Sequence, residues 1–263
     1  MKSILDDNPI DETTSSHETS TDTFPETLPV LPIRDMVAFP KMKVPFMVSL
    51  TKASLIDEAM KTDRFVGLLT AKSPEIEDPS PEDLYEVGTV AKVLHAHKND
   101  DGGLVVLLKG LNRFRVSTWE TEGPYLRAQI VLAPEIVETD LEMEALQRQL
   151  RDTVKAVMPL APHIPEEAAN AIARIKDPLQ LAYVTAFNLG LTTEIRQSIL
   201  EVDSLNRKIR ELLSLLSYEK EMLDMGNKIQ TEVREKMDKS KREYLLRQQM
   251  EAIKKELGES CLL

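Results

Sequence analysis

His95 and His97 are the residues whose chemistry first raises the question of a metal ion. They stand two positions apart in a run rich in β-branched residues, so an extended strand would place both imidazoles on one face. A zinc site needs a third His, Cys or acidic ligand at suitable spacing, and the sequence offers none beside this pair. The single cysteine, Cys261, excludes a disulfide framework and a thiolate cluster. We therefore predict no metal site and assign both histidines a structural or surface role.

Catalytic and nucleotide-binding motifs are also missing from the sequence. Serine and acidic residues are abundant, but none stands in a recognisable nucleophile motif. The phosphate-binding pattern Gly-x-x-x-x-Gly-Lys-Ser/Thr does not occur, and the nine glycines are scattered. We predict no catalytic residue and no cofactor in this chain.

Methionine and phenylalanine side chains offer a different chemistry, which is the binding of apolar polypeptide segments. Flexible, polarisable methionines adapt to varied partners, and an unfolded protein presents apolar side chains on extended backbone. Two clusters fit this role, and the candidates are Met36, Phe39, Met42 and Phe46 near the start, with Met222 and Met225 near the end. Met47 and Leu223 stand beside them. For each residue taken singly, core packing is favoured over contact with a partner, and Met42, between Lys41 and Lys43, is expected to be the most exposed.

The first cluster lies in a region that reads as short strands. Prolines in residues 28–40 exclude helix, and Val44, Phe46 and Val48 alternate as in a strand with one buried face. Further strands are expected at 64–70, 87–97, 104–109, 110–116 and 125–132, with a short helix at 54–60 and a hairpin turn at 99–103. We predict a compact, mostly antiparallel β domain over residues 28–134, after a disordered acidic tail over residues 1–27.

After residue 134 the pattern becomes helical. Amphipathic segments at 140–158, 166–175, 178–190 and 193–200, joined by short loops, predict a helical bundle over residues 139–202. No proline follows Pro178, and apolar residues recur at helical spacing from Leu205 to Leu257. One very long helix over residues 203–258 is therefore expected, with a broad apolar stripe at its root that packs on the bundle. The predicted fold class is α+β.

Composition and charge narrow the class of protein. Hydrophobic residues make up 42% and charged residues 29%, which is typical of a folded protein with a long solvated helix. The net charge of −11 argues against a general nucleic-acid-binding surface. No run approaches the ~20 apolar residues of a membrane span, and no signal peptide is recognisable. Four basic residues could form a small patch on the β domain, although separated charges that only keep the surface soluble are favoured: Lys61, Arg64, Arg113 and Arg115.

Four segments, in order, resemble the amino-terminal region of the Lon proteases, a family of ATP-dependent AAA+ proteases. They are Leu28-Pro-Val-Leu-Pro-Ile-Arg-Asp-Met-Val-Ala-Phe-Pro40, Glu86-Val-Gly-Thr-Val-Ala-Lys-Val, Gly110-Leu-Asn-Arg-Phe-Arg, and Arg242-Glu-Tyr-Leu-Leu-Arg-Gln-Gln-Met-Glu-Ala-Ile-Lys-Lys-Glu-Leu-Gly-Glu259. Residues 260–263 depart from the family, and we expect them to be a cloning remnant or the end of a truncated gene.

The resemblance implies a role in substrate recognition and assembly. In this family the region engages unfolded or tagged proteins and helps to order a hexamer. The single cysteine of the sequence independently favours a reducing, cytoplasmic setting. ATP and Mg²⁺ belong to a following ATPase module, and the serine and lysine dyad belongs to a protease module, so this chain is expected to be non-catalytic. The alternative is a self-contained scaffold or adaptor that pairs through its long helix. RNA binding is the least favoured hypothesis because of the acidic charge.

Overall fold

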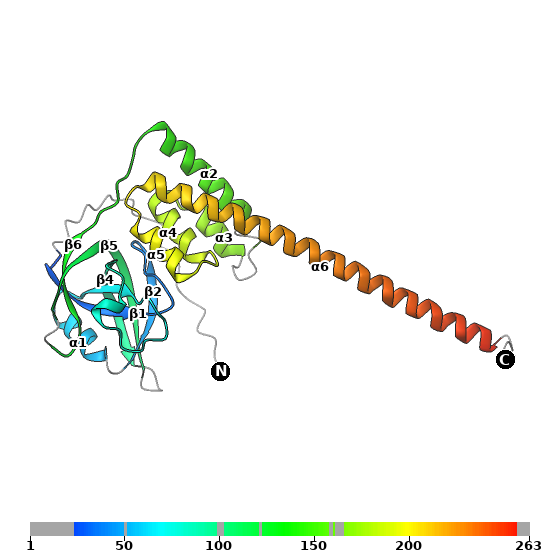
Figure 1. Ribbon diagram of the computed structural model, residues 1–263, viewed down its shortest axis with the longest axis horizontal. Coiled ribbons are helices and arrows are strands. Elements are labelled where there is room, and N and C mark those ends of the chain that lie inside the picture. The colour runs from blue at the N-terminus through cyan, green and yellow to red at the C-terminus, as the bar shows by residue number, and fades with distance from the viewer. Residues whose placement is uncertain are drawn as a thin grey trace.

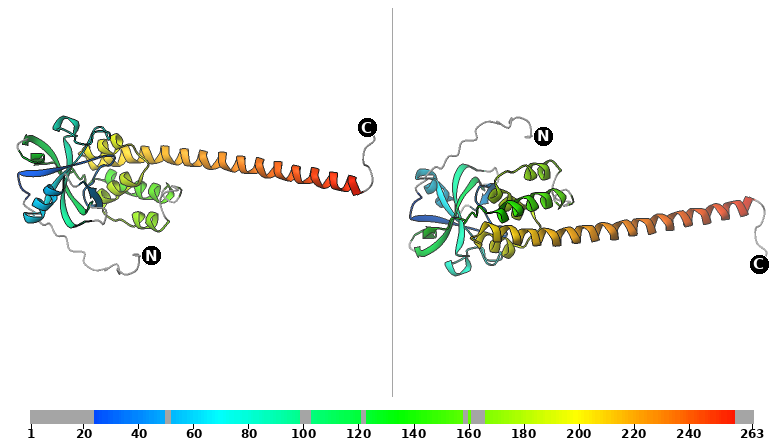
Figure 2. Two further views of the ribbon diagram at one scale, coloured as in Figure 1. Left: turned by 90° about the horizontal axis from the view of Figure 1, so that it is seen from below. Right: turned by 90° about the horizontal axis from the view of Figure 1, so that it is seen from above.

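The chain folds into a β barrel, a helical bundle packed beside it, and one helix that projects far beyond both (Figure 1). The computed structural model describes residues 24–49, 52–98, 103–120, 123–157, 160 and 166–256. The two further views show the same arrangement, with the projecting helix leaving from the side of the bundle (Figure 2).

The barrel consists of six strands and one helix. The strands are β1 (Thr27–Ile33), β2 (Lys43–Val48), β3 (Phe65–Thr70), β4 (Val87–Lys98), β5 (Leu104–Glu120) and β6 (Arg127–Leu132), and the helix is α1 (Ala53–Lys61). The strand order is β2-β5-β4-β3-β1-β6, and β6 also pairs with β5. Only the β1–β3 pair is parallel among the strand pairs of the described residues. A short 3₁₀ turn, Pro81–Asp83, precedes β4.

Barrel closure is incomplete, and the long strand β5 explains why. Its first half pairs with β2 from Leu104 to Lys109, and its second half pairs with β6 from Phe114 to Glu120. Strand β6 continues to β1, but only through Thr27–Pro29. Strand β6 therefore closes one part of the barrel by pairing with both β5 and β1. Elsewhere the barrel is split, and the gap lies between the later part of β1 and the edge strand β2, which do not pair with each other.

The helical part consists of four short helices and one long one. They are α2 (Leu141–Val157), α3 (Glu166–Ala173), α4 (Pro178–Asn188), α5 (Thr193–Glu201) and α6 (Leu205–Glu256). Local sequence starts α4, because the Asp177 carboxylate accepts a hydrogen bond from the Leu179 N–H at 3.0 Å and Pro178 occupies the first helical position. Thr192 caps α5 through the Ile195 N–H.

The root of α6 is buried in the bundle and the rest is solvated. Leu205, Ile209, Leu212 and Leu216 are fully buried in the core that α2 and α4 share with it. With 52 residues, α6 is about 78 Å long, which is several times the reach of that buried root.

The predicted α+β class, with a mostly antiparallel β domain before a bundle and a long helix, is confirmed. Ordered structure starts earlier than Leu28, because Phe24 packs edge-to-face on Phe65 with ring centroids 5.3 Å apart. The rest of the predicted acidic tail and the segment 259–263 lie outside the described residues.

Candidate functional site

A groove of about 800 Å³ follows the split in the barrel. Its two walls are Leu31–Ile33 of β1 and Pro45–Val48 of β2, which line it without pairing with each other. Pro32 and Pro45 suit such strand edges because proline has no N–H to offer a partner strand. The remaining lining residues are Arg34, Asp35, Met36, Ser49, Lys52, Glu77, Asp78 and Gly103.

Three large apolar side chains of the groove reach solvent. Met47 is 78% exposed, whereas Phe46 and Met36 are half-buried and pack against the barrel core. Strand alternation explains the difference, since Val44, Phe46 and Val48 point inward and Met47 points outward. The backbone of Met36 is held by Thr70, whose hydroxyl donates to the Met36 carbonyl at 3.2 Å. The groove therefore has a fixed frame and an adaptable apolar lining.

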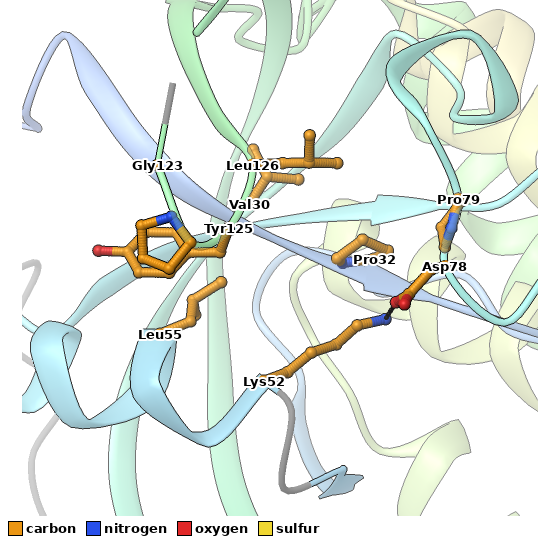
Figure 3. A pocket seen from close by; sticks show the side chains of 10 residues that line it. Val30, Pro32, Lys52, Leu55, Asp78, Pro79, Gly123, Tyr125 and Leu126 are labelled. Carbon is orange, nitrogen blue, oxygen red and sulfur yellow. Dashed lines mark ion pairs between the residues drawn. The ribbon is translucent and has the colours of Figure 1, made fainter. Parts of the chain in front are cut away.

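A second hollow of about 310 Å³ continues the groove toward α1 (Figure 3). The two share Pro32, Lys52 and Asp78, and the Lys52 ammonium lies 3.6 Å from the Asp78 carboxylate. Tyr125 and Leu55 supply apolar surface on the far side of this ion pair. The two hollows therefore meet at this ion pair, and the walls of each are partly apolar and partly polar.

Phe39 and Met42 lie elsewhere. Phe39 is 1% exposed and stacks on Tyr183 of α4, with ring centroids 5.2 Å apart, so it is a core residue and not an exposed binding candidate. Met42 is partly buried against the same helical core, which contradicts its expected prominence. Lys41 forms an ion pair with Asp177. The segment 37–42 therefore joins the barrel to the bundle.

Met222 and Met225 lie on α6 beyond the bundle, far along the chain from the groove, and are 51% and 58% exposed. They belong to an exposed apolar row made of Tyr218, Met222, Met225, Ile229, Val233 and Met237. The structure thus brings Met36 and Phe46 together, adds Met47 to them, and places the α6 pair on a separate surface.

A second exposed apolar surface escaped the sequence analysis. Leu141, the first residue of α2, is 84% exposed. Ile136 and Val137 precede it, and both are exposed. The buried face of α2 comprises Met143, Leu146, Leu150, Val154 and Val157. Leu141 does not fit the helical spacing of these buried residues, and this mismatch could have predicted from the sequence that Leu141 is exposed.

Arg113 of β5 is the hub of a buried polar joint between barrel, bundle and α6. It is 0% exposed, so its predicted place in a surface basic patch is wrong. Its guanidinium donates to the carbonyls of Leu200 at 2.6 Å and Val202 at 3.1 Å. It also pairs with Glu135 at 3.0 Å and Asp203 at 2.8 Å. One side chain from the barrel thereby fixes the two linkers that lead into α2 and α6.

The linkers are also tied to each other. The Ile136 N–H donates to the Asp203 carbonyl at 2.9 Å, and the Leu205 N–H donates to the Ile136 carbonyl at 3.0 Å. Glu138 accepts a hydrogen bond from the Ser204 hydroxyl, and its other oxygen accepts from the Asn206 N–H at 3.2 Å. The Ser204 bond, as the largest cause, lowers the pKa of Glu138 below its ordinary value. Glu138 therefore caps α6 as a carboxylate.

Tyr183 and Lys208 complete the joint. Tyr183 donates its hydroxyl hydrogen to Glu135, and burial raises its pKa far above the ordinary value. Lys208 Nζ donates to the Tyr183 hydroxyl at 3.0 Å and lies 4.4 Å from the ring centroid. Burial, followed by the charge of Arg113, lowers the pKa of Lys208 to about 7.

The described part of the chain contains neither a cluster of metal-binding side chains nor a membrane-spanning helix. No group of three or more His, Cys, Asp or Glu side chains there is arranged to hold a metal ion. None of the helices there is long and apolar enough to cross a membrane. His95 and His97 are exposed neighbours on β4.

Known proteins similar to this chain share both its sequence and its fold. The family model for the ATP-dependent protease La (LON) substrate-binding domain matches residues 27–218. The Lon protease of Dictyoglomus thermophilum is 37% identical over 240 residues, which cover 91% of this chain and 30% of that protein. The Lon protease of Syntrophus aciditrophicus is 38% identical over 257 residues, covering 96% and 32%. The chain thus spans about a third of the length of these relatives.

The solved N-terminal domain of the Mycobacterium avium complex Lon protease has the same fold. It superimposes with a TM-score of 0.60 at 26% sequence identity, covering 73% of this chain and 98% of that domain. The match of the family model to most of the chain, from β1 into α6, agrees with this structural likeness. The chain therefore belongs to the Lon protease family and carries its substrate-binding domain.

Proposed function

We propose that the chain recognises unfolded or tagged protein substrates by binding their apolar, extended segments in the groove between β1 and β2. The observation that carries this proposal is the groove itself, where Met36, Phe46 and Met47 offer apolar surface beside two strands that do not pair with each other. Folded proteins keep their apolar side chains inside, so such a lining selects unfolded ones.

The energetics favour weak and tolerant binding. Burying one substrate side chain against these residues contributes ~1.5–3 kcal/mol, so two or three contacts supply roughly 3–9 kcal/mol. The cost of association and of ordering the segment is subtracted from this, which leaves a Kd of roughly millimolar. Methionines accept side chains of different shape because they are unbranched and flexible. The charged rim formed by Arg34, Asp35 and Glu77 would disfavour uniformly charged segments.

We propose that proteolysis itself requires those parts of the longer relatives that lie outside the region similar to this chain. The relatives are about three times as long as the matched region, and we assign ATP and Mg²⁺ binding and peptide cleavage by a serine and lysine dyad to their remaining length. The chain then acts as the non-catalytic recognition part of a cytoplasmic ATP-dependent serine protease.

Binding of a fluorescent, permanently unfolded protein, measured by anisotropy against its folded form, tests the proposal. Met47→Glu places a charge in the groove and should weaken binding about tenfold, since it removes the burial of one large apolar side chain. Leu141→Glu is the matched control, because Leu141 is as exposed but lies on α2. Equal affinity of the two variants, or equal binding of folded and unfolded protein, would exclude the groove as the recognition site.

A second role, assembly, is favoured by the exposed row on α6. Six apolar side chains in one row, on a helix that leaves the bundle, are unusual for a surface that stays in water. We propose that this row, which includes Met222 and Met225, contacts other copies of the chain and helps to order a hexamer. A scaffold that only self-associates is the alternative.

Sedimentation of the wild type and of Met225→Lys distinguishes the two roles. If the chain is only a scaffold, it self-associates without any preference for unfolded over folded protein. If the chain is a recognition domain, the Met225→Lys variant should self-associate less than the wild type and should bind the unfolded probe in the groove with unchanged affinity.

A further inference from the structure

Lys208 is buried without an acidic partner. Its side chain is 0% exposed, and its direct contacts are the hydroxyl and the ring of Tyr183. Across the described residues, no carboxylate oxygen lies within 4.0 Å of its Nζ. A charged ammonium is costly in such a place, because Tyr183 is neutral and water is excluded.

Two acidic side chains near Lys208 form ion pairs with Arg113 and not with Lys208. Glu135, in the linker before α2, and Asp203, just before α6, both pair with the Arg113 guanidinium from β5. Glu211 lies one turn further along α6 and adds a weaker attraction. Arg113 opposes a second positive charge. Burial and this repulsion outweigh the three acids, so the pKa of Lys208 falls to about 7.

Lys208 lies where two helices meet, so the protonation state of its amine affects how they are attached. Its contact with Tyr183 joins the root of α6 to α4. Tyr183 in turn donates to Glu135, which Arg113 holds from the barrel. The four side chains therefore form one continuous chain of contacts across α6, α4, the linker and β5.

We propose that this chain of contacts is a proton-operated joint: with the Lys208 amine uncharged, α6 stays docked on α4 and the linker, and when the amine takes up a proton from solvent the docked arrangement loosens. The proposal is independent of the groove and of what the groove binds. It adds a regulatory property to the fold, because it ties the attachment of α6 to pH near neutrality.

The sign follows from the two protonation equilibria. In an opened joint Lys208 is hydrated and has its ordinary pKa of 10.5, so the open form binds the proton more tightly than the docked form. Between pH 10.5 and about 7 a fall in pH therefore favours opening, and below about 7 both forms are protonated and the effect levels off. The opening equilibrium should rise about fiftyfold from pH 9 to pH 7.

Hydrogen exchange and spin-label distances test the joint in the whole chain. Exchange of the first turns of α6, corrected for the intrinsic pH dependence of amide exchange, reports the opening equilibrium. Spin labels at Glu75 in the barrel and Glu221 on α6, both exposed, report the attachment of the helix, in a background with Cys261→Ser. We expect faster corrected exchange and a broader distance distribution at pH 7 than at pH 9.

Two variants separate the joint from general pH effects. Lys208→Met keeps the size of the side chain and removes the titration, so its exchange and distances should not change with pH. Lys236→Met removes an exposed lysine from the same helix and should behave as the wild type. A pH response that persists in Lys208→Met assigns the effect to another group and overturns the proposal. An unchanged wild type between pH 9 and pH 7 overturns it even if Lys208→Met does not fold.

Discussion

The ring of Phe39 stacks on the ring of Tyr183, with centroids 5.2 Å apart, although 143 residues separate the two in sequence. Phe39 comes from the loop after β1 and Tyr183 from α4, so a loop of the barrel contributes an aromatic ring to the apolar core of the bundle. The polar joint around Arg113 begins at the hydroxyl of the same tyrosine. Tyr183 therefore serves both the apolar and the polar contact between the two parts.

Phe39→Ala should destabilise the fold by about 3–5 kcal/mol, because it leaves a cavity beside Tyr183 in a fully buried place. Chemical denaturation followed by circular dichroism measures the change. Met47→Ala is the control and should shift stability by less than about 0.5 kcal/mol, since Met47 is exposed. Similar losses for the two variants would contradict the assignment of Phe39 to the interface.

Arg113→Ala should cost about 3–5 kcal/mol, because it leaves Glu135 and the carbonyls of the linkers without their buried donor. Arg115→Ala, two residues along the same strand, removes an exposed arginine 3.8 Å from Glu86 and should cost less than about 1 kcal/mol. Urea denaturation of both variants makes the comparison. A small loss for Arg113→Ala would mean that the linkers hold α6 without it.

Glu138→Gln should weaken α6 in a pH-dependent way. The hydrogen bond from Ser204 lowers the pKa of Glu138 in the folded state. Ionised Glu138 therefore stabilises the fold above its ordinary pKa of 4.5, and this stabilisation is lost as the pH falls through the lowered pKa. The variant should be less stable than the wild type at pH 7, and the difference should shrink well below pH 4.5. Thermal melts at both pH values, with Glu144→Gln as an exposed control, measure this; a constant difference would contradict the capping role.

Two glycines should respond to alanine in opposite directions. A Cβ on Gly110 would lie 2.4 Å from the Phe39 carbonyl oxygen, so Gly110→Ala must push the interface loop away from β5 and lose stability. A Cβ on Gly226 would meet nothing within 4 Å, so Gly226→Ala should stabilise α6 by up to about 1 kcal/mol. Denaturation midpoints decide, and a loss of stability for Gly226→Ala would reveal a contact on α6.

Features that depend on local pattern could be predicted from the sequence. The start of α4 follows from the Asp177-Pro178 pair, and the buried root of α6 follows from the spacing of Leu205, Ile209 and Leu212. The outward position of Met47 was also within reach, because alternation sends Phe46 inward. These features need only neighbours a few residues away.

Features that depend on distant contacts could not be predicted in the same way. Arg113 looks like any surface arginine until the carbonyl of Leu200, 87 residues later, folds over it. Phe39 and Phe46 are the same residue type in neighbouring segments, but Phe39 is buried because Tyr183, from a distant helix, stacks on it. The groove itself arises because β5 divides its pairing between β2 and β6, and strand patterns do not reveal which strands pair.

The length of α6 turns its attachment into the pivot of a lever. Over about 78 Å, a rotation of only 5° at the root carries the far end through about 7 Å, which exceeds the rise of a full helical turn. The few side chains around Arg113 and Lys208 therefore help to set, to within a few degrees, where the tip of this helix lies.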